Sequence, residues 1–234
     1  MLQRFLPRRS SRASSLSLTR CFIPSDGKKK VNITKAETAV VTADERTSGA
    51  DNILAFAATR DIDMIFCSPI AVMAPLWESL AKRAEAMGPK ETSSCRSSRP
   101  MYLNCRHELL AVCLAAGYYR FSGRPQMVIL PTALGVLNGS MGLRSALQER
   151  TPMLVLSPDT QTYGTIASED PGSEWPSLLV DHHGPARVGE TSVKWAKEIK
   201  LSSELLPELR RALYISNTVP RGPTLLQIPF EIMM

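Results

Sequence analysis

Two patterns of hydrophobic and polar residues alternate along residues 48–231. Short apolar runs, typical of strands that are buried on both faces, are separated by longer segments with a helical period. The runs predict strands at 63–67, 101–103, 126–130, 152–156 and 224–228. The intervening segments predict helices near 53–58 and at 71–87, 106–120, 135–148 and 204–216. This order predicts an α/β fold, a parallel sheet with helices on both faces.

Two polar stretches interrupt the alternation. Residues 88–100 (GPKETSSCRSSRP) predict an exposed loop, and residues 157–190 are irregular and rich in Gly, Pro, Asp and His. Apolar runs all fall short of the roughly 18 residues that a membrane-spanning helix needs, so the sequence predicts no membrane span.

Several polar residues, a proline and a glycine follow the ends of predicted strands. Ligands of a parallel α/β sheet bind beyond the carboxyl ends of its strands. Ser68 and Pro69 end the first strand, Glu108 opens the helix after the second, and Gly135 and Asn138 open the next helix. We therefore expect these five residues on one rim of the sheet, around a ligand site.

Glu108 stands at the start of an almost unbroken apolar segment and has two interpretations. It can stabilise the helix dipole from the first turn, with Asn104 as the N-cap, which is a structural role. On a helix, however, it shares a face with Ala111, Val112 and Ala115, where a carboxylate is partly withdrawn from water. The residue pattern alone leaves both roles open.

The net charge of +6 is concentrated at the start of the chain. Residues 1–30 hold 8 of the 28 basic residues and 1 of the 22 acidic ones, so the remainder carries 20 against 21. Residues 31–234, with a net charge of −1, lack the excess of basic residues that binding to a phosphate backbone requires. We therefore expect no nucleic-acid partner.

The first 25 residues are rich in Arg and Ser and contain no acid. This composition is typical of a mitochondrial transit peptide, so we predict a transit peptide at 1–30, a polar lead at 31–47 and a location in the mitochondrial matrix. The alternative is a basic tail without a targeting role. The five cysteines and three histidines have no metal-ligand spacing, which predicts free thiols and no metal site within the chain.

One set of residues resembles a known family. The residues form the pattern RHE-x8-GY-x-R-x2-G: Arg106-His107-Glu108, Gly117-Tyr118, Arg120 and Gly123. This pattern resembles the pyrimidine-binding (PYR) domain of thiamine-diphosphate enzymes, in the acetolactate synthase and benzoylformate decarboxylase group. The similarity extends over 48–231, through Gly135 and Asn138 to the closing segment 221–229.

The resemblance implies a catalytic role for Glu108. In the family this glutamate hydrogen-bonds N1′ of the cofactor's aminopyrimidine and promotes its imino tautomer, which removes the C2 proton of the thiazolium. The activated cofactor, thiamine diphosphate, then attacks a 2-oxo acid. By the same resemblance Ser68, Pro69, Gly135 and Asn138 would line the cofactor site, in a PYR-like domain that spans 48–231.

Two departures from the family pattern affect this expectation. The family's Gly-Pro-Gly turn reads Ala133-Leu134-Gly135 here, and the chain contains no Gly-Asp-Gly, the motif that holds Mg²⁺ and the diphosphate. The resemblance therefore implies that Mg²⁺ binds only through a partner: a chain with the diphosphate-binding (PP) domain, or a full-length homologue, in a dimer. The alternative is a non-catalytic truncated paralogue that docks on a full-length thiamine enzyme. A third hypothesis, a domain for another nucleotide such as NAD, has no fingerprint to support it.

Overall fold

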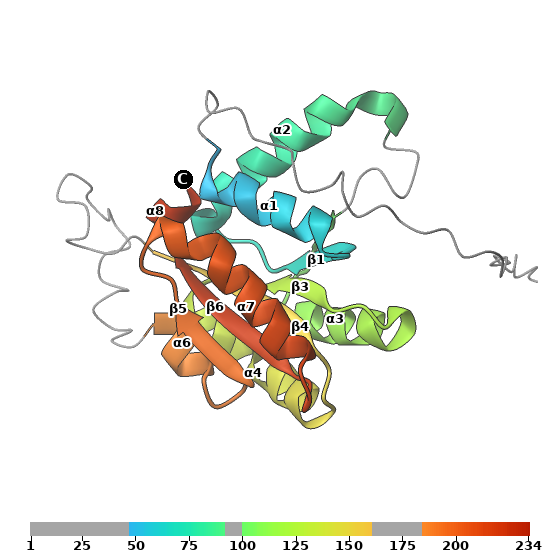
Figure 1. The fold of residues 1–234 in the computed structure, drawn as a ribbon, viewed down its shortest axis with the longest axis vertical. Helices are drawn as coiled ribbons and strands as arrows, with labels where there is room; N and C mark the ends of the chain where they lie inside the picture. Colours follow the sequence, from blue (N-terminus) through green and yellow to red (C-terminus); the bar gives the residue numbers. More distant parts are fainter. Residues whose placement is uncertain (1–46, 92–99, 161–183) are drawn as a thin grey trace, which may run out of the picture. The chain divides into compact units, whose positions relative to one another are not determined.

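The computed structural model describes residues 47–91, 100–160 and 184–234, which form a sheet flanked by helices. Six parallel strands lie in the order β2-β1-β3-β4-β6-β5 (Figure 1). The strands are β1 Met64–Cys67, β2 Met101–Asn104, β3 Gln126–Ile129, β4 Met153–Asp159, β5 Trp195–Glu198 and β6 Pro223–Pro229. The helices are α1 Gly49–Thr59, α2 Ala74–Glu91, α3 Glu108–Ser122, α4 Thr132–Gln148, α6 Gly184–Gly189, α7 Leu205–Asn217 and α8 Phe230–Met233. The predicted α/β class, with a parallel sheet covered on both faces, is confirmed.

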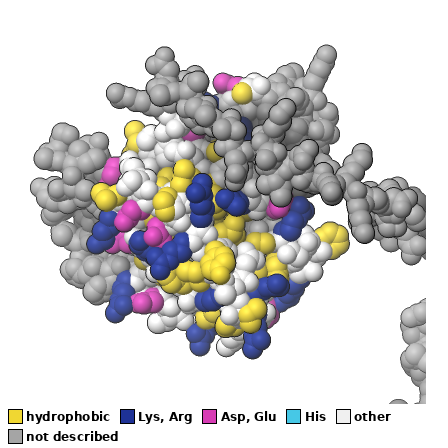
Figure 2. Space-filling model, viewed as in Figure 1, with side chains coloured by type: hydrophobic (Ala, Val, Ile, Leu, Met, Phe, Trp, Pro, Cys, Tyr) yellow, Lys and Arg dark blue, Asp and Glu magenta, His cyan; other side chains and the backbone are white. Residues whose placement is uncertain are grey.

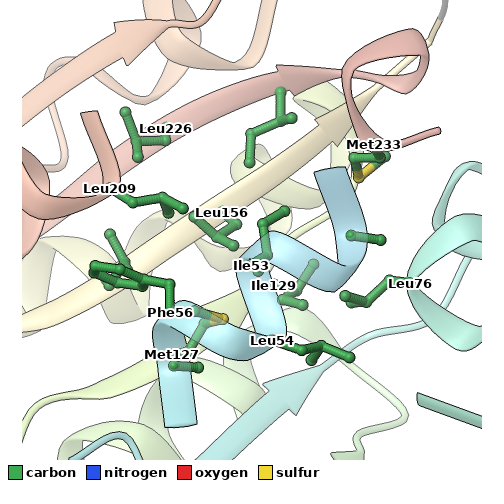
Figure 3. Close-up of a cluster of buried hydrophobic side chains, with 14 of the residues drawn as sticks. Ile53, Leu54, Phe56, Leu76, Met127, Ile129, Leu156, Leu209, Leu226 and Met233 are labelled. Atoms are coloured by element: carbon green, nitrogen blue, oxygen red, sulfur yellow. The ribbon is translucent and has the colours of Figure 1, made fainter. Parts of the chain in front are cut away.

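Alternate residues of the central strands enter two separate cores. In β3, Met127 and Ile129 face the core built with α1, α2, α7 and α8, whereas Val128 faces the core built with α3 and α4. Figure 3 shows the first core, where Ile53 and Phe56 of α1 lie among side chains of the strands. Because these strands are buried on both faces, they appear in the sequence as continuous runs of apolar residues.

Helix α1 begins with a capping box. Ser48 Oγ accepts a hydrogen bond from Asp51 N–H at 3.1 Å, and Asp51 Oδ2 accepts one from Ser48 N–H at 3.2 Å. Partial burial alone would raise the pKa of Asp51, but hydrogen bonds from Ser79 and Ser48 and the charge of Lys82 outweigh it. The pKa of Asp51 therefore lies below its ordinary value.

Five predicted strands and five predicted helices are present, with shifted ends. Helix α4 begins at Thr132, three residues before the predicted start, and α2 continues to Glu91, into the predicted loop. Strand β2 was expected to be buried but is a largely exposed edge strand. Asn104 is the last residue of β2, so its predicted N-cap role is wrong. The cap is His107, three residues further along the chain.

Three elements were not predicted: β5, α6 and α8. The predicted transit peptide at 1–30 and the polar lead, apart from residue 47, lie outside the described residues, as do 92–99 and 161–183. Among the helices that the structure describes, all are too short or too polar to cross a membrane.

Candidate functional site

Three turns at the carboxyl ends of the strands converge on the Glu108 carboxylate. Ser68, the residue after β1, donates its hydroxyl to Glu108 Oε1 at 3.1 Å. Asn138, in the second turn of α4, donates its Nδ2 to Glu108 Oε2 at 3.3 Å. Three of the five predicted site residues are thus in direct contact, and each carboxylate oxygen has one donor.

The carboxylate is largely but not fully withdrawn from water. Its side chain is 15% exposed, Ser68 is buried and Asn138 is exposed. Beneath it the same face of α3 buries Ala111 and Val112 in the core. Because two carboxylate oxygens offer about four lone-pair positions, the two donors leave Glu108 able to accept another hydrogen bond from the open side.

His107 caps α3 and is not an ionic partner of Glu108. Its Nδ1 accepts a hydrogen bond from Leu109 N–H at 3.1 Å. A ring nitrogen that accepts in this way carries no proton to donate, although Glu108 Oε2 lies 3.9 Å away. His107 therefore supplies the missing acceptor at the helix start, a role that sequence analysis had given to another residue.

The other residues of the RHE…GY motif shape the structure around α3. Tyr118 donates its hydroxyl to buried Asp63 at 3.0 Å, which ties α3 to the start of β1. Arg120 pairs with Glu149 at the end of α4. Gly123 caps α3 in the left-handed region at φ 71°. The motif therefore contains one site carboxylate and several residues that position its helix.

Pro69 and Gly135, the other predicted site residues, lie on the same turns without a described hydrogen bond to Glu108. Pro69 is exposed. A methyl group added at Gly135 would lie 3.1 Å from both Leu130 C and Pro131 Cδ, so this glycine lets α4 begin close against the end of β3. Whether either residue contacts a cofactor stays a prediction.

Two further glycines bring α4 against α3. A methyl group at Gly139 would lie 2.8 Å from Leu130 Cδ1, just after β3, and 3.6 Å from Val112 Cγ2 of α3. One at Gly142 would lie 3.0 Å from atoms of Leu109 and Val112, both on α3. Asn138 lies on α4 directly before Gly139, so the close packing of the two helices sets its distance from Glu108.

An unusual backbone conformation beside the site was not predicted from the sequence. Thr132 opens α4 with φ 57°, in the left-handed region that β-branched residues rarely adopt. Ser157 Oγ donates to the Thr132 carbonyl at 3.4 Å. The motif comparison had drawn attention to Ala133, which is not among the residues with positive φ in the described part of the chain.

A second set of hydrogen-bonded polar side chains, which was not predicted from the sequence, lies where β4 and β6 end. Gln227 donates its Nε2 to Asp159 Oδ2 at 2.8 Å and accepts a hydrogen bond from Ala186 N–H at 3.1 Å. The signal that could have identified Asp159 was its position three residues after the predicted strand 152–156, on the rim where ligands of a parallel sheet bind.

Metal-ligating side chains do not cluster in the described residues: none of their His, Cys, Asp and Glu form a group of three that could hold an ion. Cys67, Cys105 and Cys113 are free thiols. Burial, with smaller effects of nearby Cys105 and Glu108, raises the pKa of Cys67 to about 12. Cys67 is therefore not a nucleophile of this site.

Comparison with known proteins identifies the family. Residues 47–173 match the family described as thiamine pyrophosphate enzyme, N-terminal TPP binding domain, which is more than half of the chain. The chain belongs to this family. The resemblance to the PYR domain of thiamine-diphosphate enzymes is thereby confirmed.

Similar proteins carry names from the expected group. The acetolactate synthase large subunit of Haemophilus influenzae is 22% identical over 185 residues, covering 79% of this chain and 28% of that protein. The benzoylformate decarboxylase of Pseudomonas aeruginosa is 28% identical over 130 residues, covering 56% of this chain and 23% of that protein. The chain thus spans about a quarter of the length of these curated relatives.

A solved structure supports the fold. The X-ray structure of a thiamin diphosphate-dependent enzyme from Mycobacterium smegmatis aligns with a TM-score of 0.61 and 18% identity. The alignment covers 80% of this chain and 32% of that one.

Proposed function

We propose that this chain is the pyrimidine-binding part of a thiamine-diphosphate-dependent enzyme that decarboxylates or joins 2-oxo acids, as an acetolactate synthase does. The observation that carries the proposal is the Glu108 carboxylate, held by Ser68 and Asn138 at the carboxyl rim of the sheet in a chain of this family.

The hydrogen-bonding groups of Glu108, Ser68 and Asn138 suit an aminopyrimidine ring. Glu108 keeps lone pairs toward the open side, where it would accept a hydrogen bond from N1′ of the ring. Ser68 and Asn138 would hold the carboxylate in place while it carries or releases that proton. When bound, thiamine diphosphate supplies the carbon nucleophile and the electron sink for the departing carboxyl group.

A partner would complete the site. The chain spans about a quarter of the length of these curated relatives, and its residues 47–173 match the N-terminal TPP binding domain. We propose that a chain with the diphosphate-binding domain, or a full-length homologue, supplies the diphosphate contacts and Mg²⁺.

The test is turnover by the complex isolated with the tagged chain, supplied with thiamine diphosphate and Mg²⁺. Carbon dioxide release is measured with pyruvate and with benzoylformate. Glu108→Gln should lower kcat about 100-fold or more while the complex stays intact. The matched control, Glu78→Gln on the exposed face of α2, should leave kcat unchanged.

Two outcomes would redirect the proposal. Full activity of the Glu108→Gln complex would show that the carboxylate has no part in turnover. A complex whose activity is the same with or without this chain would instead support the non-catalytic docking paralogue.

We also propose a mitochondrial location, on the composition of residues 1–30. Relatives from Aspergillus candidus and Saccharomyces cerevisiae are named as mitochondrial, whereas others are named as chloroplastic. A fluorescent protein fused after residue 234 should enter mitochondria, and should stay outside them when Arg4, Arg8 and Arg12 are replaced by Glu.

A further inference from the structure

The turn that leads from β3 into α4 contains a threonine in a strained conformation. Thr132 has φ 57°, in the left-handed region where the Cβ atom of an L-residue lies too close to its own backbone. Such a conformation persists only where the surrounding contacts hold it. Pro131, the N-cap of α4, has no side-chain group that could accept a hydrogen bond from the first turn. The start of α4 must therefore be held by groups from outside the helix.

One of these groups is the hydroxyl of Ser157, on β4. Ser157 is 0% exposed, and its Oγ donates to the Thr132 carbonyl at 3.4 Å. In the described part of the chain this carbonyl is the one acceptor of that hydroxyl. A buried hydroxyl that loses its acceptor destabilises the fold, so the contact restrains the carbonyl although it is long. The main chain adds a second tie, because Leu130 N–H donates to the Leu156 carbonyl at 2.9 Å.

The restraint on Thr132 extends to the Glu108 carboxylate through α4. Thr132 and Asn138 belong to this helix and lie within two of its turns of each other. A helical segment of this length moves as one piece, so a shift at Thr132 also displaces Asn138. The contact from Asn138 Nδ2 to Glu108 Oε2 is 3.3 Å long, already beyond the usual range of an N–H···O hydrogen bond. A small displacement of α4 is therefore enough to break it.

We propose that Ser157 is a positioning residue of the Glu108 site. Through the Thr132 carbonyl it fixes the start of α4, and α4 in turn holds Asn138 against Glu108. Strand β4 thereby acts on a site whose other described groups come from the turns after β1, β2 and β3. The effect of Ser157 on turnover rests on the proposed function. The positioning itself is a property of the free chain and can be measured without a cofactor.

The side-chain amide NMR signals of Asn138 test the proposal in the full chain without cofactor. The signals are assigned by their absence from the spectrum of Asn138→Ala, and Glu108→Ala shows where they lie when the acceptor is gone. Ser157→Ala should move them most of the way to that second position. Ser157→Cys keeps nearly the same volume with only a weak donor, and should move them in the same direction. Adding Thr132→Gly to Ser157→Ala should restore them, because glycine adopts φ 57° without strain.

The matched control is Ser216→Ala. Ser216, near the end of α7, is also 0% exposed, and its hydroxyl donates to the Gly222 carbonyl at 2.9 Å. Helix α7 lies on the opposite face of the sheet from α4. Figure 2 shows the face that carries α7, where basic, acidic and hydrophobic side chains are interspersed. The control loses a comparable buried hydrogen bond, so it should destabilise the chain while the Asn138 signals stay in place.

Turnover of the isolated complex gives a second readout. Ser157→Ala should lower kcat about tenfold because a misplaced group slows the reaction, and should leave KM nearly unchanged because Ser157 does not touch the substrate. Unchanged Asn138 signals in both Ser157 variants would overturn the proposal, as would equal movement in Ser216→Ala. Asn138 signals that move as expected while kcat stays constant would support the positioning, and would count against the proposed role of Glu108 in turnover.

Discussion

The hydrogen bond from Ser68 to Glu108 should be measurable as a coupling free energy. The 3.1 Å contact joins a buried hydroxyl to a carboxylate that is 15% exposed. Hydrogen bonds to charged groups contribute about 1.5–3 kcal/mol. The contact is longer than the 2.5–2.7 Å of strong charge-assisted bonds, and glutamine at 108 keeps a neutral acceptor, so we expect a coupling of about 1 kcal/mol between Ser68→Ala and Glu108→Gln.

The assay is a double-mutant cycle from urea unfolding at pH 7, at one protein concentration so that association contributes equally to all four proteins. A second cycle with Asn138→Ala is the control. Asn138 is exposed and its contact is 3.3 Å long, so water competes for it and the coupling should be about 0.5 kcal/mol or less.

Additive effects of Ser68→Ala and Glu108→Gln, within about 0.3–0.5 kcal/mol, would refute this reasoning. The carboxylate would then be held by packing or by water and not by the hydroxyl. A larger coupling for Asn138 than for Ser68 would show that the burial of a donor does not determine the strength of its hydrogen bond to Glu108.

Three further predictions concern titration, reactivity and backbone conformation. The pKa of Asp51 is lower in the folded chain than in the unfolded chain, where it is about 3.9. The ionised Asp51 side chain therefore stabilises the fold fully above this unfolded pKa, and the stabilisation is lost as the pH falls through the lower folded pKa. The difference in urea midpoint between the unmutated chain and Asp51→Asn should thus be constant at neutral pH and shrink below about pH 4; a constant difference down to pH 2 would contradict it. At pH 8, mass spectrometry should find alkylation at exposed Cys113 and none at Cys67 until the chain unfolds, because burial raises the pKa of Cys67 to about 12; equal rates would refute the burial. Gly117→Ala should raise the free energy of unfolding by up to about 1 kcal/mol, since a methyl group there meets no atom within 4 Å in a helix interior. Gly123→Ala should lower it by about 1 kcal/mol because of its φ of 71°, and effects of the same sign would contradict the assigned conformations.

The order of the central elements was predictable because burial imposes a simple pattern. Strands β1, β3, β4 and β6 are covered on both faces, so each reads as an apolar run. The edge strand β5 gives no such signal. Its Lys197 pairs with Glu208 of α7 at 2.8 Å, and its Trp195 lies under Arg211 at 5.5 Å. These partners are distant in sequence, and a local pattern cannot show them.

The convergence at the site was predictable, but the partner of each side chain was not. Parallel strands place their carboxyl ends on one rim, so Ser68, Glu108 and Asn138 had to lie near one another. Which of them donates to which oxygen depends on how closely α4 approaches α3, and that distance is set by Gly139 and Gly142. The same glycines have a packing role in any close helix pair, so the sequence gives no sign that they also position a donor.

The missing Gly-Pro-Gly turn has a different meaning in the structure than in the sequence. A glycine is needed where φ is positive or where backbone must pass close to another group. The positive φ falls on Thr132 and not on Ala133, and the close approach at Gly135 is to Leu130 and Pro131 of the chain itself. Ala133 is buried in an ordinary helical turn. Alanine in place of glycine at position 133 therefore removes no backbone conformation that this turn adopts. The substitution is not by itself a reason to regard the Glu108 site as inactive.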